Sequence, residues 1–378
     1  MKKLQNLLIV SLLLITFQGI SQEVEVWISD AGGFNNPPWF IYKSDINGNN
    51  LTEVMNQSNQ IKWPEDIIFL EEENTVLISN ITSTSPASGY ISRHDIKTGV
   101  FLGYFAEDLS GPTRMKIGPD GFLYVLQWGN TNNRVLRYEL DGTFVDEFTA
   151  LGVTQSIGLD WDEPGNLYVS SYGGSKVLKF DSNGGYIEEF INTGLSGPTN
   201  IFFDKSGNGD LIVFNWNSGI VKRFDSEGNF IENLITGVGQ CEGVDFMSNG
   251  DMLIGVGIDG SVRKYDSDFN FIENFIEGGT ILTPNAITIR EVPLSVPSNK
   301  LDENFMNPTI GIRFSINTSE IDKIEKLIIY NSQGKLIEEI DISKNIFWEA
   351  NSYSEGVYLI KALTLNGKIS TQKVLVKK

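Results

Sequence analysis

The chain has 378 residues, a formal net charge of −19 and a single cysteine, Cys241, which excludes an intramolecular disulfide. Residues 22–295 hold 16 basic and 38 acidic residues, a net charge of −22. Such an acidic surface repels phosphate backbones and anionic lipid, which argues against nucleic-acid and membrane-surface partners. A segment of this length is also large enough to bury a core without disulfides.

Residues 1–21 have the features of a secretory signal peptide. They begin with Lys2 and Lys3, continue with an apolar run over 7–17 and end on the small residue Ser21. The apolar run is too short to span a bilayer, so we expect no transmembrane segment. The sequence therefore predicts an exported protein.

A sequence motif of short apolar runs and glycine turns recurs over residues 22–292. In one copy, Leu167-Tyr168-Val169 is followed by a second apolar run and by a hairpin from Asp181 to Gly184. The central residues of the matching runs are Ile28, Ile78, Val125, Val169, Val213 and Ile254. Steps of this length, with four β-rich runs per copy, are typical of the four-stranded blades of a β-propeller.

The two ends of the repeat region complete each other. The first runs open at Pro64, Pro112, Thr154, Pro198, Cys241 and Pro284. The run at Pro284 has no second run after it, whereas the start of the region, 23–29, reads as a second run without a first. We therefore predict an all-β fold with a six-bladed β-propeller closed by both ends, which leaves no open sheet edge; seven blades are the alternative.

After a predicted linker at 293–303, the segment 304–378 has a sequence pattern that differs from the repeats. Strand-like runs around Ile329, Val357 and Val374 are separated by turns that contain Gly334 and Gly367. This pattern predicts a small C-terminal Ig-like β-sandwich.

The same segment resembles the type A sorting domain of the type IX secretion system of Bacteroidetes-type bacteria. The matching phrases are Asn307-Pro308-Thr309, Tyr330-Asn331 with Gly334, Gly356-Val357-Tyr358 and the terminal Lys377-Lys378. The resemblance implies the type IX secretion machinery as a partner through residues 304–378. It also implies a secreted, extracellular or outer cell-surface location. An ordinary Ig-like adhesive module is the alternative.

The repeats resemble the NHL group and the related gluconolactonase-like six-bladed propellers. A Pro-x-x-Ile-x-x-Asp phrase followed by Gly-x-Leu-Tyr-Val carries this resemblance across residues 24–290. It implies the fold more strongly than the function, because propellers host many unrelated activities.

In such propellers the first strand of each blade lines the central channel. The position after each opening residue gives a ring of Glu65, Thr113, Gln155, Thr199, Glu242 and Asn285. Glu65, Glu242 and Asn285 come from the closure blade and its two neighbours, so we expect them to converge. Their oxygen ligands suit Ca²⁺, and the gluconolactonase-like resemblance implies metal ligands at such positions. A polar, water-filled channel mouth without a metal is the alternative.

Aromatic residues recur in the loops between the second and third runs. They are Trp39, Trp128, Tyr172 and Trp216. Exposed aromatic rings stack on sugars or hold peptide side chains, whereas the alternative is that each ring packs on the neighbouring blade. Arg114 and Asn200, one position further along the first runs, complete the predicted ligand-binding set.

His94 is the only histidine in the sequence. It occupies the position that Tyr138, Phe180, Phe224 and Tyr265 fill in other repeats, so we interpret it as a packing residue. This interpretation argues against a Ser-His-Asp triad and a zinc site.

The sequence favours an exported propeller that binds a glycan or peptide on its aromatic-rimmed face without catalysis. The alternative is a Ca²⁺-dependent lactonase-like hydrolase in which Glu65, Glu242 and Asn285 hold the metal and Arg114 stabilises an oxyanion. A spacer or partner-docking module is a third interpretation.

Overall fold

The computed structural model describes residues 23–82, 88–129, 133–204, 208–292, 305–317, 321–364 and 369–378. The chain divides into two compact units, Met1–Pro293 and Leu294–Lys378. The predicted signal peptide and the predicted linker lie outside the described residues. Within the described ranges, no helix has the length and hydrophobicity needed to cross a bilayer.

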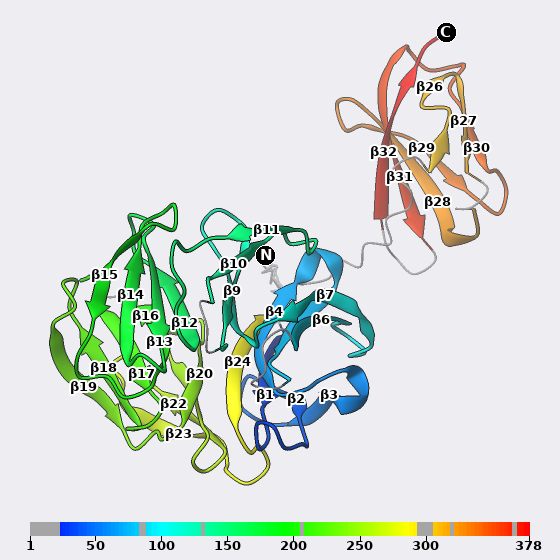
Figure 1. Cartoon of the computed structure of the whole chain (residues 1–378). Coiled ribbons are helices and arrows are strands. Elements are labelled where there is room, and N and C mark those ends of the chain that lie inside the picture. The colour runs from blue at the N-terminus through cyan, green and yellow to red at the C-terminus, as the bar shows by residue number, and fades with distance from the viewer. Residues whose placement is uncertain are drawn as a thin grey trace, which may run out of the picture. The chain divides into compact units, whose positions relative to one another are not determined.

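The described residues of the first unit form six four-stranded antiparallel sheets (Figure 1). In spatial order the first three are β24 (Pro284–Glu291), β1 (Val24–Asp30), β2 (Phe40–Asp45), β3 (Thr52–Asn56); β4 (Pro64–Leu70), β5 (Thr75–Asn80), β6 (Gly89–Asp95), β7 (Phe101–Leu109); and β8 (Pro112–Ile117), β9 (Leu123–Gln127), β10 (Leu136–Tyr138), β11 (Phe144–Glu147). The other three are β12 (Ser156–Trp161), β13 (Leu167–Ser171), β14 (Lys176–Phe180), β15 (Tyr186–Ile191); β16 (Pro198–Phe203), β17 (Leu211–Asn215), β18 (Ile220–Phe224), β19 (Phe230–Thr236); and β20 (Cys241–Phe246), β21 (Met252–Val256), β22 (Ser261–Tyr265), β23 (Phe271–Ile276). Two single 3-10 turns, η1 (Gln57–Asn59) and η2 (Glu71–Glu73), complete the unit.

The six first strands meet in a closed cycle. Contacts join β24 to β4, β4 to β8, β8 to β12, β12 to β16, β16 to β20, and β20 back to β24. The closing sheet combines both ends of the unit, because β24 pairs with β1 (Figure 1). This pairing places Trp27 opposite Thr288. The predicted all-β propeller architecture and its closure are therefore confirmed.

Burial follows the order of the strands within each sheet. All five residues of β17, Leu211–Asn215, are completely buried, because neighbouring sheets cover both of its faces. A strand buried on both faces reads as a continuous apolar run rather than an alternating one. The fourth strands lie at the rim, where Phe230 of β19 and Phe271 of β23 are more than half exposed.

Each first strand has a register irregularity near its start. In β4, Pro64 pairs with Asn80 whereas Asp66 pairs with Ser79, and the other five first strands show a shift at the same place. A bulge re-aims the side chains around it. At the bulge of β4, Arg114 meets the backbone carbonyl of Glu65 and the carboxylate of Asp66.

His94 is the packing residue that the repeat predicts. Its side chain is completely buried, lies 5.8 Å from the ring of Phe101, and its Nε2 is 2.8 Å from Ser92 Oγ. Burial lowers the pKa of His94 to about 4, which keeps the folded-state imidazole neutral at mildly acidic pH.

A lowered histidine pKa makes stability depend on pH in one direction. In the unfolded chain this histidine binds a proton below about pH 6.5, whereas folded His94 stays neutral down to about pH 4. Its contribution to the free energy of unfolding is therefore complete above pH 6.5 and is lost as the pH falls. At about 1.4 kcal/mol per pH unit, the loss reaches about 3 kcal/mol by pH 4. We expect His94→Phe to flatten the pH dependence of urea unfolding in this window. An unchanged pH dependence of the free energy of unfolding would mean that His94 does not cause it.

The second unit is a two-sheet sandwich. Its sheets are β25 (Met306–Asn307), β27 (Arg313–Ile316), β30 (Phe347–Glu349), and β26 (Ile310–Gly311), β32 (Ile369–Val376), β31 (Gly356–Thr364), β28 (Ile324–Asn331), β29 (Leu336–Asp341); η3 (Ile321–Lys323) precedes β28. Its core includes Trp348 stacked on Phe314 at 5.4 Å. The predicted sandwich is confirmed, and one of its strand pairs, β26 with β32, is parallel.

Candidate functional site

One pocket of the propeller lies where the first strands begin; we call it the mouth pocket. It has a volume of about 330 Å³. Its lining consists of Phe34, Asn35, Trp63, Glu65, Ile81, Trp128, Ile157, Tyr172, Trp216, Glu242 and Asn285. Four of these residues come from four different first strands, so the pocket opens onto the central channel.

Aromatic rings form the rim of the mouth pocket. Phe34 contacts Trp63 at 5.6 Å and Trp216 at 6.0 Å between ring centroids. Trp128 and Tyr172 form a second pair at 5.2 Å, and the Tyr172 hydroxyl donates to Asn217 Oδ1. These tilted pairs hold one another in place and present apolar surface to the pocket.

Two of the rim aromatics have a strained backbone. Phe34 has a φ of 58° and Trp63 a φ of 50°, in the left-handed region that bulky side chains rarely adopt. In two other blades the residue before the opening proline is a glycine, Gly111 or Gly197. Strain of this kind persists where the surroundings impose it and often marks a functional site.

The strain at Trp63 predicts an unusual order of stability. We expect Trp63→Gly to be more stable than Trp63→Ala by about 1 kcal/mol, because only glycine relieves the left-handed conformation. Trp39 is the matched control, since it is also a buried tryptophan but is not among the residues with positive φ. There the alanine variant should be at least as stable as the glycine variant. Urea unfolding of the four variants provides the comparison.

Polar groups form the floor of the mouth pocket. Glu65 and Glu242 are each 3% exposed and Asn285 is 2% exposed. Asn285 Nδ2 donates to Glu65 Oε1 at 2.8 Å, and the carboxyl groups of Glu65 and Glu242 share a hydrogen bond. The predicted convergence of these three residues is therefore present in the structure.

Arg114 crosses the channel beneath this floor. From β8, its Nη1 donates to Asp66 Oδ1 at 2.9 Å and to the backbone carbonyl of Glu65 at 3.2 Å. Its Nη2 donates to Glu242 Oε1 at 3.2 Å and to the carbonyl of Asn285 at 3.1 Å. The third residues of three other first strands are small and leave room for this side chain; they are Gly158, Gly243 and Ala286.

Burial and charge together set the protonation of this network. Burial, followed by the charge of Glu242, raises the pKa of Glu65 well above its usual range, so the neutral Glu65 carboxyl donates to Glu242. Burial also raises the pKa of Glu242 and of Asp66, and in both cases the Arg114 guanidinium opposes it. One arginine thus stabilises two buried carboxylates.

The predicted ring is right at five positions and wrong at one. β12 begins at Ser156, so Ile157 rather than Gln155 is its second residue and lines the mouth pocket. Thr113 and Thr199 are in the ring but donate their hydroxyls to backbone carbonyls of the next first strand, each at 2.7 Å. These two threonines therefore tie neighbouring blades together.

The predicted ligand-binding residues are divided among three places. Trp128, Tyr172 and Trp216 line the mouth pocket. The expectation that Trp39 is exposed is wrong: it is 6% exposed, and its Nε1 donates to the carbonyl of Phe34 at 2.7 Å, which supports the loop that carries that ring. Arg114 and Asn200 line a separate pocket of about 1010 Å³ towards the other end of the first strands.

Phe34 and Trp63 are the rim residues that the sequence did not identify. The available signal for Trp63 was its position before an opening proline, where two other repeats have glycine. Phe34 lies in the loop between the second and third strands of the closing sheet, where the sequence predicts Trp39 as the exposed ring.

Two buried polar atoms of the mouth pocket have no hydrogen-bond partner among the described residues. They are Trp63 Nε1, a donor, and Asn285 Oδ1, an acceptor. A buried polar atom left unpaired costs about 1–3 kcal/mol, so such atoms are points where a ligand or water binds.

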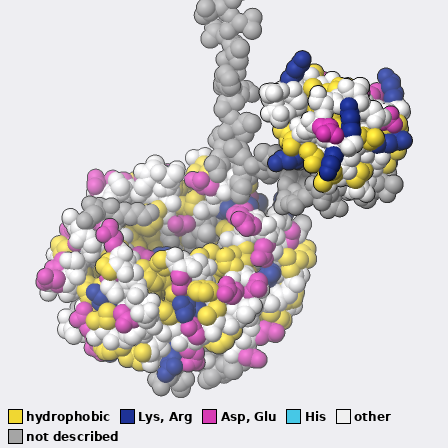
Figure 2. Space-filling view, turned by 90° about the horizontal axis from the view of Figure 1, so that it is seen from above, with side chains coloured by type: hydrophobic (Ala, Val, Ile, Leu, Met, Phe, Trp, Pro, Cys, Tyr) yellow, Lys and Arg dark blue, Asp and Glu magenta, His cyan; other side chains and the backbone are white. Residues whose placement is uncertain are grey.

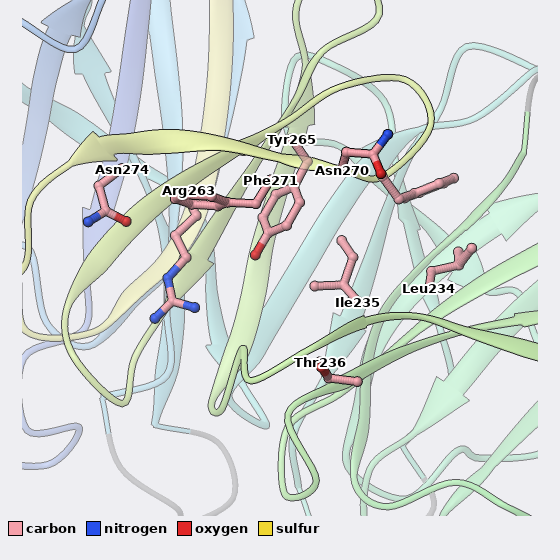
Figure 3. Close-up of a pocket in the computed structure, with 9 residues that line it drawn as sticks. Leu234, Ile235, Thr236, Arg263, Tyr265, Asn270, Phe271 and Asn274 are labelled. Carbon is pink, nitrogen blue, oxygen red and sulfur yellow. The ribbon is translucent and has the colours of Figure 1, made fainter.

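A groove at the rim of the propeller provides a contrast. It lies between β19 and the β22–β23 hairpin, where Figure 3 shows Arg263, Tyr265 and Phe271. Arg263 is already bonded to Asp259 and to the carbonyl of Gly237. Among the described residues, none that lines this groove has a buried polar side-chain atom without a partner. The mouth pocket is therefore the stronger candidate site.

Comparisons with known proteins identify the C-terminal unit and support the fold of the first. Residues 305–377 match the secretion system C-terminal sorting domain. No curated protein matches the chain. A chain of a solved structure described as "Nidogen/Laminin Complex" is similar with a TM-score of 0.56 at 14% identity, and 71% of this chain covers 99% of that one. A protein of unknown function from Bacteroides caccae gives a TM-score of 0.53 at 15% identity, with the same coverage.

These matches settle two points. The predicted type IX sorting domain is confirmed, and it marks the chain for export to the cell surface or the extracellular space. At 14–15% identity, the two structural matches show the propeller fold alone.

Proposed function

We propose that the first unit is a six-bladed, NHL-type propeller that binds a glycan or peptide in the mouth pocket without catalysis, on the cell surface or outside the cell. The observation that carries this proposal is that two buried atoms, Trp63 Nε1 in the aromatic rim and Asn285 Oδ1 in the floor, have no hydrogen-bond partner among the described residues. A ligand with both a hydrogen-bond donor and an acceptor satisfies them. Apolar surface with a few convergent polar groups is the usual composition of a ligand site.

The arrangement of the site supports binding over proton-transfer chemistry. Glu65 and Glu242 are bonded to each other, and Glu242 is also held by Arg114. Each carboxyl group is therefore engaged within the protein. The rim rings, in contrast, are only partly buried at Trp128, Tyr172 and Trp216 and are free to contact a ligand.

The proposal is tested by comparing the full mature chain with two variants on glycan and peptide arrays. Trp216→Leu removes a rim ring, whereas Phe230→Leu removes an exposed ring on β19, away from the mouth pocket. We expect Trp216→Leu to lose the signal and Phe230→Leu to keep it. A signal that both variants retain would place binding elsewhere and contradict the proposal.

The alternative, a Ca²⁺-dependent lactonase-like hydrolase, needs Glu65, Glu242 and Asn285 as metal ligands. Their donor set fits an arginine-centred network better than calcium, because Glu65 Oε1 accepts from Asn285 Nδ2 and Glu242 accepts from Arg114.

Thermal unfolding with excess Ca²⁺ or with EDTA tests this alternative. We expect the same melting temperature in both, because Arg114 already supplies the positive charge at the floor. A bound ligand at a hundredfold over its dissociation constant adds about 2.7 kcal/mol, which a melting curve resolves. A rise with Ca²⁺ that Glu65→Ala abolishes would instead support the metal site.

A further inference from the structure

We infer that the mouth pocket receives the cationic side chain of a lysine or arginine residue from a basic peptide. This inference rests on the proposed binding function and names its ligand class. Five aromatic rings line a pocket of about 330 Å³, near the lower limit for small-molecule sites. This size suits one inserted side chain. An ammonium or guanidinium group is attracted to the faces of such rings, most strongly to tryptophan.

The floor of the mouth pocket offers one unpaired acceptor to a cation. Asn285, at 2% exposure, presents a carbonyl oxygen that has no partner among the described residues, beside the bonded carboxyl groups of Glu65 and Glu242. A lysine or arginine side chain has an aliphatic stem and a charged head. Inserted from the rim, its stem would contact the aromatic rings and its head would reach the oxygen atoms of the floor.

Local charge does not oppose a cation. Arg114 is the one cationic side chain bonded to Asp66 and Glu242 within the described residues, and its terminal nitrogens are directed to those carboxyl groups and to two backbone carbonyls. The Arg114 charge beneath the pocket is therefore neutralised inside the protein.

The wider surface adds long-range attraction. Residues 22–295 have a net charge of −22. Figure 2 shows Asp and Glu side chains spread over the visible face of the propeller, with fewer Lys and Arg. Such a field raises the association rate of a basic partner. Trp63 Nε1, which has no partner among the described residues, is a donor that a cation cannot satisfy but a peptide carbonyl can. This favours a peptide over a free amine.

The test uses tryptophan fluorescence titration of the full mature chain at physiological salt. The probes are N-acetyl-lysine methylamide, its uncharged analogue N-acetyl-norleucine methylamide, spermidine and a set of neutral oligosaccharides. We expect the lysine compound to bind at least about tenfold more tightly than the norleucine compound. Trp216→Leu should weaken it about tenfold, whereas Phe230→Leu should leave it unchanged.

The remaining outcomes separate this inference from the proposed function. Binding of oligosaccharides alone would overturn the cationic ligand but leave the proposed function standing. Equal binding of the lysine compound to wild type and Trp216→Leu would indicate surface attraction only and overturn the inference. Tight binding of spermidine with weak binding of the lysine compound would overturn the peptide source. If no probe and no array ligand binds, both proposals fail.

Discussion

Replacing Arg114 by methionine is expected to lower the free energy of unfolding by about 3–5 kcal/mol at neutral pH. Its guanidinium contacts Asp66 at 2.9 Å and Glu242 at 3.2 Å, and all three side chains are less than 10% exposed. Methionine fills similar volume but leaves two buried carboxylates without a positive partner. Such a deletion is costly even where the intact ion pair itself contributes little.

The pH dependence of this variant provides a second readout. Without Arg114 the buried carboxyl groups fold in the neutral form, and taking up those protons costs more as the pH rises above their unfolded pKa values. Glu242, with a pKa of about 7, is already largely protonated in the wild type at pH 5, so the loss in Arg114→Met should shrink between pH 7 and pH 5 mainly through Asp66. Urea unfolding at both pH values measures it.

Two controls make the Arg114 result specific. Arg134→Met breaks an exposed pair with Glu147 and should cost less than about 0.5 kcal/mol. Adding Asp66→Asn and Glu242→Gln to Arg114→Met should recover much of the lost stability, since the unpaired charges are then absent. If Arg114→Met is as stable as wild type at pH 7, the arginine does not hold the channel network together.

The channel shows how far a repeat can predict a site. Five of the six second residues of the first strands were correct, because a proline or the flanking repeat fixed the register. The sheet that begins with β12 has no opening proline, and its predicted register is two residues early, at Gln155 instead of Ile157. A shift of two residues keeps the same face of a strand, so alternation of apolar and polar residues did not reveal it.

Interactions across the channel were not predictable from the repeat. Sequence placed Arg114 one position past the ring but did not show that its side chain reaches Glu242 on a strand that is not a neighbour. That reach depends on the small third residues Gly158 and Gly243 of other blades. The loop between β1 and β2 contains two aromatic residues, and the sequence does not indicate which of them faces the mouth pocket. Packing decides this: Trp39 is buried and Phe34 lines the pocket.

We predict that hydrogen bonds of Asp30 hold the two ends of the propeller unit together. It ends β1 and is 1% exposed. Its Oδ1 accepts from the backbone amides of Gly32 and Thr283, each at 2.9 Å, and its Oδ2 accepts from the amide of Leu282 at 3.1 Å. One carboxylate thus joins residues about 250 positions apart, directly before the strand that carries Asn285.

We expect Asp30→Ala to lower the free energy of unfolding by about 3–4 kcal/mol, because three amides at a largely buried position lose an ionised acceptor. Asp30→Asn retains one carbonyl oxygen and should lose about half as much. Asp45 is the matched control: its carboxylate also accepts three hydrogen bonds, but at an exposed turn, so Asp45→Ala should cost about 1 kcal/mol or less. Urea unfolding gives the three values, and hydrogen exchange should show faster opening of β1 and β24 in Asp30→Ala alone. Equal losses in Asp30→Ala and Asp45→Ala would mean that closure depends on the β1–β24 ladder rather than on this carboxylate.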